Sequence, residues 1–338
     1  MKSLRATDQD VILSSRVRLA RNYADVPFAP RMNHEWAAET IARAHAAIMP
    51  EPGQYEIYRI GELSETQRRQ LVEHHLISYD LLRFAAHSAA LISSGKTVSI
   101  MVNEEDHLRI QGLLPGMQLA KAADLAFAAE NALCQSHAFA FDEQWGFLTS
   151  CPTNTGTGMR ASVMLHLPAL NATGKLSAVL QAFGKLGLTV RGIYGEGSEA
   201  RGNLYQLSNQ VTLGRTEEDM IETLMAAAAQ ISGHERHIRE HIHEADATAM
   251  LDKLMRSVGI MGHARLMGNA ECMQRYSDLR VLAAIGIVEA DLSQLDLLMM
   301  DLQPASLHVK SGTILSEQAQ SALRADLLRE YIQTIAAT

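Results

Sequence analysis

The sequence predicts an α+β fold, with a first region that mixes strands and helices and a second region built from helices. Up to about residue 232, short runs of β-branched and apolar residues alternate with helical patterns. Beyond that point the strand signals fade, and helical periodicity with many methionines takes over. We therefore expect two domains, residues 1–232 and residues 233–338.

Composition and charge exclude several classes of protein. The chain has 338 residues, of which 47% are hydrophobic and 20% charged, which is a globular balance. A net charge of −8 argues against binding to nucleic acid or to an anionic membrane, and no apolar run is long enough to span a bilayer. The three cysteines are widely spaced, which suits a reducing cytoplasm and gives neither a disulfide framework nor a zinc site.

Local patterns predict the elements of the first region in order. Ser64 and Gln67 form a capping box that opens a helix through Leu71 and Val72. Thr216 to Asp219 caps a long helix with an alanine run. The remaining predictions are an extended segment that opens residues 10–31, strands at 54–60, 97–102, 187–194 and 203–213, and helices at 34–48, 117–134 and 173–186.

The most informative stretch is Cys-Pro-Thr-Asn-Thr-Gly-Thr-Gly-Met-Arg-Ala-Ser, residues 151–162. A strand-like run from Trp145 to Thr149 leads into it, and a β-branched and apolar run leads out. Its glycines accept positive φ and its hydroxyls add donors, so the turn is suited to an anion, with a thiol at its entrance and an arginine at its exit. An ordinary polar turn with a buried cysteine is the alternative.

Arginines recur in or beside the polar turns. In an extended segment Arg16 and Arg18 fall on one face, next to Ser14 and Ser15, and two such charges repel each other unless an anion lies between them. Planar guanidinium groups bind phosphate through two parallel hydrogen bonds and stay charged. The set suited to the polyphosphate of a nucleotide is Arg16, Arg18, Arg109, Arg160 and Arg191.

Two acidic loops complement these arginines. Glu104, Glu105 and Asp106 follow a strand, and they are either a solvated loop or a carboxylate cluster that takes a cation or Mg²⁺. If a helix begins there, Arg109 lies one turn beyond Glu105 on the same face. The loop after Arg191 carries Glu196 and Glu199. Paired carboxylates suit a guanidinium acceptor, because they align it and take its proton, and the thiolate of Cys151 would add negative charge.

Other motifs are incomplete. Gly95-Lys96-Thr97 lacks the earlier glycine of a phosphate-binding loop, and the Gly195-Glu196-Gly197 run precedes a strand instead of a helix. His234, His237 and His241 share a helical face, but charged neighbours favour a solvated helix over a metal site. We expect no metal held by protein ligands.

Four motifs in one order carry a resemblance that covers nearly the whole chain. Ser-Ser-Arg-Val-Arg-Leu-Ala-Arg-Asn, Val-Asn-Glu-Glu-Asp-His-Leu-Arg, Cys-Pro-Thr-Asn-x-Gly-Thr-Gly-x-Arg-Ala-Ser and Arg-Gly-x-Tyr-Gly-Glu-Gly-Ser-Glu resemble the phosphagen (guanidino) kinases. More closely, they are similar to the bacterial protein-arginine kinases of the McsB type. This resemblance implies a mainly antiparallel sheet flanked by helices, followed by a helical C-terminal domain.

The resemblance also implies the site. Glu105 matches the first catalytic carboxylate and Cys151 the cysteine near the guanidinium. Glu196 is similar to the second carboxylate of protein-arginine kinases, whereas Glu199 aligns with the loop glutamate of small-molecule kinases, so we favour Glu196 and keep Glu199 as the alternative. The implied cofactors are ATP and Mg²⁺, and the implied ATP-binding residues are Ser14, Ser15, Arg16, Val17, Arg18, His75, Arg109, Arg160, Ala161, Ser162, Val163, Met164, Arg191, Gly192, Ile193, Tyr194 and Gly195.

The acceptor follows from architecture. Kinases of free arginine or creatine carry a helical domain before the Ser-x-Arg-x-Arg motif, whereas only thirteen residues precede Ser14 here. We therefore expect phosphorylation of arginine side chains on proteins, in stress-related quality control or proteolysis. A kinase of a free guanidino metabolite and an adaptor for a protease are the alternatives. Expected partners are proteins with exposed arginines, a chaperone–protease complex, an activator protein and a second copy of the chain.

One departure from the resemblance concerns the C-terminal domain. Protein-arginine kinases carry an Arg-Asp-x-x-Arg-Ala motif there, where phosphoarginine binds. The counterpart here is Ala325-Asp326-Leu327-Leu328-Arg329-Glu330, which keeps Asp326 and Arg329 as candidate phosphoarginine ligands but loses the first arginine. Arg324 is one residue out of register, about 100° away on a helix. Activation by phosphoarginine is therefore not implied by this motif.

Overall fold

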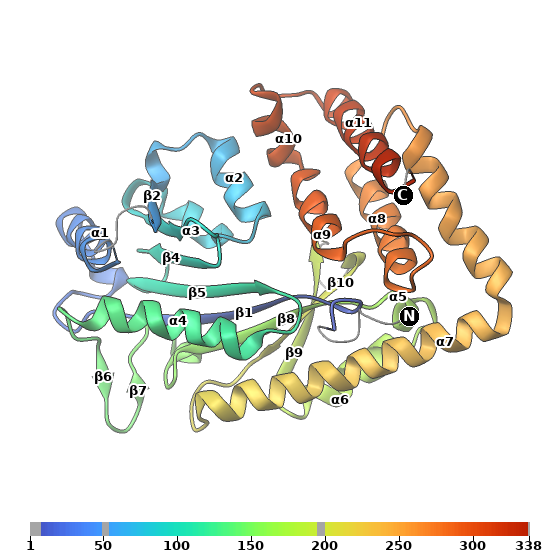
Figure 1. The fold of residues 1–338 in the computed structure, drawn as a ribbon. Coiled ribbons are helices and arrows are strands. Elements are labelled where there is room, and N and C mark those ends of the chain that lie inside the picture. The colour runs from blue at the N-terminus through green and yellow to red at the C-terminus, as the bar shows by residue number, and fades with distance from the viewer. Residues whose placement is uncertain (1–7, 49–53, 195–199, 337–338) are drawn as a thin grey trace.

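A central antiparallel sheet organises the first two thirds of the chain (Figure 1). The computed structural model describes residues 8–48, 54–194 and 200–336. Within these residues the sheet has eight strands in the order β2-β3-β4-β5-β1-β8-β10-β9, and β6 and β7 form a separate hairpin. The strands are β1 Ile12–Arg21, β2 Tyr55–Arg59, β3 Ala89–Ser93, β4 Val98–Val102, β5 Leu108–Pro115, β6 Phe141–Asp142, β7 Gly146–Phe147, β8 Met159–His166, β9 Leu188–Tyr194 and β10 Ala200–Asn209.

Helices lie on both sides of this sheet and build the C-terminal region (Figure 1). Helix α4 and the first half of α7 pack on the face opposite to the one that carries the arginines. Among the described residues, no helix is both long enough and apolar enough to cross a bilayer. The helices are α1 His34–Ile48, α2 Glu65–Glu73, α3 Tyr79–Arg83, α4 Leu119–Cys134, α5 Pro168–Ala172, α6 Leu176–Gly184, α7 Glu217–His263, α8 Asn269–Ala284, α9 Leu292–Asp301, α10 Pro304–Ser311 and α11 Glu317–Ala336.

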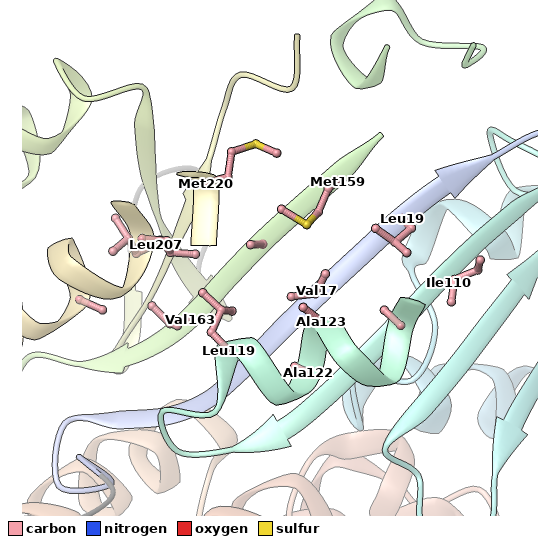
Figure 2. Close-up of a cluster of buried hydrophobic side chains, with 14 of the residues drawn as sticks. Val17, Leu19, Ile110, Leu119, Ala122, Ala123, Met159, Val163, Leu207 and Met220 are labelled. Carbon is pink, nitrogen blue, oxygen red and sulfur yellow. The ribbon is translucent and has the colours of Figure 1, made fainter. Parts of the chain in front are cut away.

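The main core lies between the sheet and α4 (Figure 2). Val17 and Leu19 on β1 are fully buried against this helix. Arg16 and Arg18 alternate with them along the strand, so these two side chains leave from the other face of the sheet. Gly112 on β5 sets the distance between the layers, because a Cβ atom there would lie 2.1 Å from the carbonyl oxygen of Ala122. The close approach of α4 to β5 therefore requires a glycine.

Helix α7 joins the two regions. It runs for 47 residues and has one non-helical residue, Asp246, with φ −158° and ψ 82°. The side chain of Asp246 accepts a hydrogen bond from the backbone of Ala249, so the second half of α7 begins as a freshly capped helix. The boundary predicted at residue 232 falls inside the first half of α7.

Most predicted elements match the structure. The capping box at Ser64 is present, and Thr216 accepts a hydrogen bond from Asp219 at the start of α7. The helix considered after Glu105 is wrong, because residues from Leu108 onward form β5. The strand expected at 203–213 begins earlier, at Ala200, and ends at Asn209. The strand expected up to Thr149 is reduced to the two residues of β7.

Replacing Gly112 by alanine should lower the free energy of unfolding by roughly 2–4 kcal/mol, because the new methyl group collides with backbone of α4. Gly233 is the matched control, since it lies in α7 and a Cβ added there would have no neighbouring side chain or packed element within 4 Å. Gly233→Ala should raise the stability by roughly 0.5–1 kcal/mol. Urea unfolding measures the free energy of unfolding of both variants. Equal changes in the two variants would contradict the close contact between β5 and α4.

Candidate active site

The five arginines expected from the sequence come together on the face of the sheet opposite to α4. Arg16 and Arg18 lie on the central strand β1, and Arg18 is paired in register with Arg160 on β8. Arg109 opens the neighbouring strand β5, and Arg191 lies on β9, where it pairs with Gln206 of β10. Strands β5, β1 and β8 are neighbours, and β9 lies beyond β10, so four separate parts of the chain bring guanidinium groups to this face of the sheet.

Hydrogen bonds fix two of these arginines. The Nη2 atom of Arg16 donates to Oε1 of Gln206 at 3.0 Å, and its Nε donates to Oγ of Ser162 at 3.4 Å. Arg109 donates through Nη1 to Glu104 at 2.8 Å and through Nη2 to Glu105 at 3.3 Å. These contacts hold the guanidinium planes in place before any ligand arrives.

The arginine cluster is electrostatically strained. Burial and then the nearby charges of Arg16, Arg109 and Arg160 hold the pKa of Arg18 well below its usual value. Burial and then the charge of Arg191 lower the pKa of Arg160. The buried Nε of Arg18 has no hydrogen-bond partner among the described residues. A cluster of this kind favours a polyanion that supplies both charge and acceptors.

The loop between β4 and β5 presents the acidic residues. Asn103 adopts a left-handed φ of 61°, and its side-chain amide donates to the carbonyl oxygens of Ala37 and His87. The buried Asp106 accepts from the side chain of Asn22 at 2.8 Å and from the backbone N–H of Ser150 at 2.7 Å. Asp106 therefore ties this loop to the turn that begins at residue 151.

Glu104 and Glu105 have different environments. Glu104 is buried, and its carboxylate accepts from Arg109 and from the hydroxyl of Ser78. The side chain of Glu105 is 43% exposed and reaches the outer edge of the arginine cluster. Its pKa is raised, chiefly by desolvation, with the charges of Asp106 and Glu104 adding to the rise and Arg109 opposing it. Glu105 is thus an accessible carboxylate with enhanced basicity.

The turn at residues 151–158 has positive φ angles at its two glycines, as the sequence predicted. Gly156 has φ 113° and Gly158 has φ 62°. A Cβ atom on Gly158 would lie 2.7 Å from the carbonyl oxygen of Ala20, so the turn packs directly on the end of β1. Cys151 is half-buried, and its Sγ lies 3.1 Å from Oγ1 of Thr153.

His75 lies beside the same cluster. It follows α2 with a left-handed φ of 59°, and its carbonyl oxygen accepts from Nε2 of Gln111 on β5 at 2.8 Å. Burial, then the charges of Arg16 and His74, lower the pKa of His75 to about 3. The ring is therefore neutral at physiological pH, which suits contact with an uncharged heterocycle.

The other expected ATP-binding residues divide by face. The hydroxyl of Ser15 is turned to the α4 side, where it donates to Gly116 and accepts from Gln118. The residues whose side chains are buried are Ser15, Val17, Ala161, Ser162, Val163 and Met164, whereas Ser14, Gly192 and Ile193 lie on strands with partial or full exposure. The side chain of Tyr194 is not described.

Three predicted residues lie outside the described residues. Gly195, Glu196 and Glu199 belong to the segment 195–199, whose structure is not described. The two ends of this segment are fixed, because Tyr194 at the end of β9 pairs with Ala200 at the start of β10. The choice between Glu196 and Glu199 stays a prediction.

The C-terminal motif is a separate site on α11. Asp326 and Arg329 form an ion pair, and Arg329 also donates to the carbonyl oxygen of Ala264. Arg324 is buried, and it donates to the carbonyl oxygens of Leu302 and Met267. Arg324, the arginine that is one residue out of register, therefore has a structural role in the C-terminal region.

Sequence reasoning missed several residues that hold the site. Glu104 was seen only as part of an acidic run, although its carboxylate orients Arg109. Gln206 was detectable as a polar residue inside the apolar pattern of β10. Nothing local marks Asn22 or Gln111, whose partners lie on distant segments.

The metal site considered for His234, His237 and His241 has no support in the described structure. Within the described part of the chain, no group of three or more His, Cys, Asp or Glu side chains is placed to hold a metal ion. His237 and His241 stack at 4.6 Å. A cavity of about 620 Å³ between α5, α7 and α8 lies apart from the five arginines.

Replacing Arg18 by methionine should have opposite effects on stability and on anion binding. Without an anion, the loss of repulsion should raise the free energy of unfolding by about 1 kcal/mol. Affinity for tripolyphosphate should fall about tenfold or more, because a charged hydrogen-bond donor is lost. Thermal unfolding with and without tripolyphosphate measures both effects.

Arg59→Met provides the matched control, because Arg59 is 53% exposed and lies 4.0 Å from Glu62. It should change neither quantity appreciably. An Arg18→Met protein that kept its full response to tripolyphosphate would contradict the assignment of an anion site.

Comparison with curated proteins gives close relatives over the whole chain. The chain is 44% identical to the protein-arginine kinase of Caldanaerobacter subterraneus subsp. tengcongensis, over 97% of each chain. It is 44% identical to that of Desulforamulus reducens, over 99% of this chain and 96% of the relative. The protein-arginine kinase of Moorella thermoacetica is 42% identical, over 96% of this chain and 94% of the relative.

Solved structures share the fold. A lombricine kinase superposes with a TM-score of 0.60 at 24% identity, over 69% of this chain and 68% of that one. The duplicated taurocyamine kinase of Schistosoma mansoni, with bound transition-state-analogue components, gives a TM-score of 0.59 at 28% identity, over 69% of this chain and 35% of that one.

Two family models divide the chain between them. Residues 37–238 match the C-terminal catalytic domain of the ATP:guanido phosphotransferases. Residues 247–338 match the C-terminal domain of the protein-arginine kinase McsB, so the two matches meet on either side of Asp246. The chain therefore belongs to the ATP:guanido phosphotransferase family and, within it, to the protein-arginine kinases.

Proposed function

We propose that this protein transfers the γ-phosphoryl group of ATP to the guanidinium group of arginine side chains on proteins. The observation that carries the proposal is the position of Glu105, an accessible carboxylate of raised pKa at the edge of a cluster of five arginines. Phosphoryl transfer needs positioning and charge neutralisation more than covalent chemistry. A base and a polycationic surface side by side supply both.

The residues fit ATP. Arg16, Arg18 and Arg160 repel one another without an anion, and the unpartnered Nε of Arg18 is a donor available to a phosphate oxygen. Mg²⁺ fits in a different way, because the described residues form no metal cluster. It would be held through ATP oxygens and water, as is usual for this ion, and it would neutralise charge on the transferred group.

Glu105 is the group that takes the proton. As a guanidinium nitrogen of the acceptor forms its bond to the γ-phosphorus, the bond from that phosphorus to the bridging oxygen of ADP breaks, and one N–H proton passes to the Glu105 carboxylate. Arg109 holds Glu105 by a hydrogen bond and faces the phosphates, so one residue aligns both reactants. The charges of Arg18 and Arg160 stabilise the negative charge that develops on the leaving oxygen.

A protein-bound arginine is the acceptor we favour. Support comes from the relatives, which are named protein-arginine kinases, and from the match to their C-terminal domain. We propose that the partners are proteins with exposed arginines, marked in this way for quality control. We also propose a cytoplasmic location, with which three unbridged cysteines agree.

Glu105→Gln should abolish phosphorylation, with a loss of rate of roughly 10²-fold or more, because the amide cannot accept the proton. ATP affinity should stay within about twofold, since the arginine cluster is untouched. The assay is mass spectrometry of a loosely folded, arginine-containing protein after incubation with Mg²⁺ and ATP, with detection of acid-labile phosphate on arginine nitrogen.

Glu143→Gln is the control, because Glu143 is an exposed carboxylate on the β6–β7 hairpin. Free arginine is tested in parallel. Robust ADP release with free arginine and none with protein would overturn the protein acceptor and favour a metabolite kinase. Unchanged activity of Glu105→Gln would show that another group is the base.

The pH dependence should report the raised pKa of Glu105. The base acts only when it is deprotonated, so the rate should fall as pH drops through this pKa. Because the pKa is raised, the loss should begin at a higher pH than for an ordinary glutamate. ATP binding, measured at the same pH values, should change much less. A rate that followed ATP binding at every pH would contradict the role of Glu105.

A further inference from the structure

The C-terminal domain makes a specific contact with the segment that carries His75. The two carboxylate oxygens of Glu73, at the end of α2, accept the backbone N–H groups of Ala305 and Ser306, each at 2.8 Å. The hydroxyl of Ser306 donates to the same carboxylate at 2.9 Å. Glu73 therefore caps the N-terminus of α10, a helix that lies more than two hundred residues further along the chain.

This cap replaces one that α10 lacks. The residue at its own N-cap position is Gln303, whose side chain makes no capping bond and instead donates to the carbonyl oxygen of Met299. A carboxylate also favours the positive end of the helix dipole. The free backbone donors of α10 are thus satisfied by a residue from the catalytic region, and the contact links the two regions at a distance from α7.

The same corner of the chain leads to the arginine cluster. His74 follows Glu73 directly and lies with Nε2 3.2 Å from the hydroxyl of Ser306. His75 comes next, in a left-handed conformation that a non-glycine residue adopts only when its surroundings hold it. Its ring lies near Arg16 of the arginine cluster. The three consecutive residues thus run from the C-terminal domain to the ATP-binding surface.

On the far side, α10 is held by α11. Arg324 donates to the carbonyl oxygen of Leu302, the residue just before the turn that begins α10. Two hydrogen-bonded contacts, Arg324 with Leu302 and Glu73 with Ala305 and Ser306, joined by short stretches of chain, therefore connect α11 with α10 and with the segment that carries His75.

We propose that Glu73 is a positioning residue for ATP: by capping α10 it lets the C-terminal domain hold His75 in its binding conformation. The inference rests on the proposed function only in placing the nucleotide over the arginine cluster. The C-terminal domain then tunes the affinity for ATP, and any change at α11 that moves α10 is transmitted to the nucleotide site.

Glu73→Gln tests this inference, because the amide keeps one acceptor and loses the other. Calorimetry should show that the Kd for ATP rises about fivefold. Steady-state kinetics should show the same rise in the KM for ATP, with kcat at saturating ATP and the KM for the protein acceptor within about twofold. If Glu73 had a purely structural role, the variant would instead show a lower kcat, a higher KM for both substrates and a lower unfolding temperature.

Two further variants sharpen the test. Ser306→Ala acts from the C-terminal domain and should also weaken ATP binding, although the bonds of Ser306 in the described structure go to Glu73 and His74 and not to an arginine of the cluster. Combined with Glu73→Gln, it should add little, because both changes break the same contact. Glu65→Gln is the matched control, since Glu65 lies on the same helix, is 75% exposed and pairs only with Arg69 in the described structure.

The inference is overturned if Glu73→Gln and Ser306→Ala bind ATP as tightly as Glu65→Gln. Failure of the proposed function has a different result. A wild-type protein that binds ATP but phosphorylates no protein arginine would refute the proposed acceptor, and the ATP Kd values of the variants would still decide the role of Glu73.

Discussion

Mutual repulsion among arginines on one face of a sheet is the constraint on which the site depends. Backbone hydrogen bonds between β5, β1 and β8 hold Arg18 beside Arg160, and packing of Val17 and Leu19 against α4 prevents the central strand from rotating away. The fold thus maintains a charge arrangement that its side chains alone would oppose. The protein without ligand therefore already holds its positive charges together. Because folding has overcome their repulsion, a polyanion such as ATP does not have to do so when it binds.

On the acidic side of the site, the fold likewise holds like charges close together, here the carboxylates of three consecutive residues. Glu104 is buried and paired with Arg109, which leaves the neighbouring Glu105 as the accessible carboxylate. Asp106 then fastens this loop to the turn of Cys151 through the backbone of Ser150. Three consecutive acids therefore have three environments: Glu104 orients an arginine, Asp106 joins two loops, and Glu105 is the one that stays accessible, as the proposed role of a base requires.

How much of the structure could be predicted from the sequence depended on whether the interacting residues lie close together in the chain. Alternation placed Arg16 and Arg18 on one face, and glycines located the left-handed turn at 156–158, because both signals are local. The fold class and the catalytic glutamate came from the resemblance of four motifs. The contact of Glu73 with α10 was not predictable, since neither end has a local signature. The extended conformation after Glu105 was missed because spacing alone suggested a helix.

The N-terminal end of β1 has a consequence for the order in which the protein is assembled. Asp10 is bound by Arg236, and its carbonyl oxygen accepts from Arg239 and Arg280, while β1 pairs with β5 and with β8. β1 is the first strand in the described part of the chain, and it can pair with β5 and β8 once about half of the chain has been synthesised. The segment around Asp10 gains its contact with Arg280 only later, so the complete anchoring of the central strand comes late in synthesis.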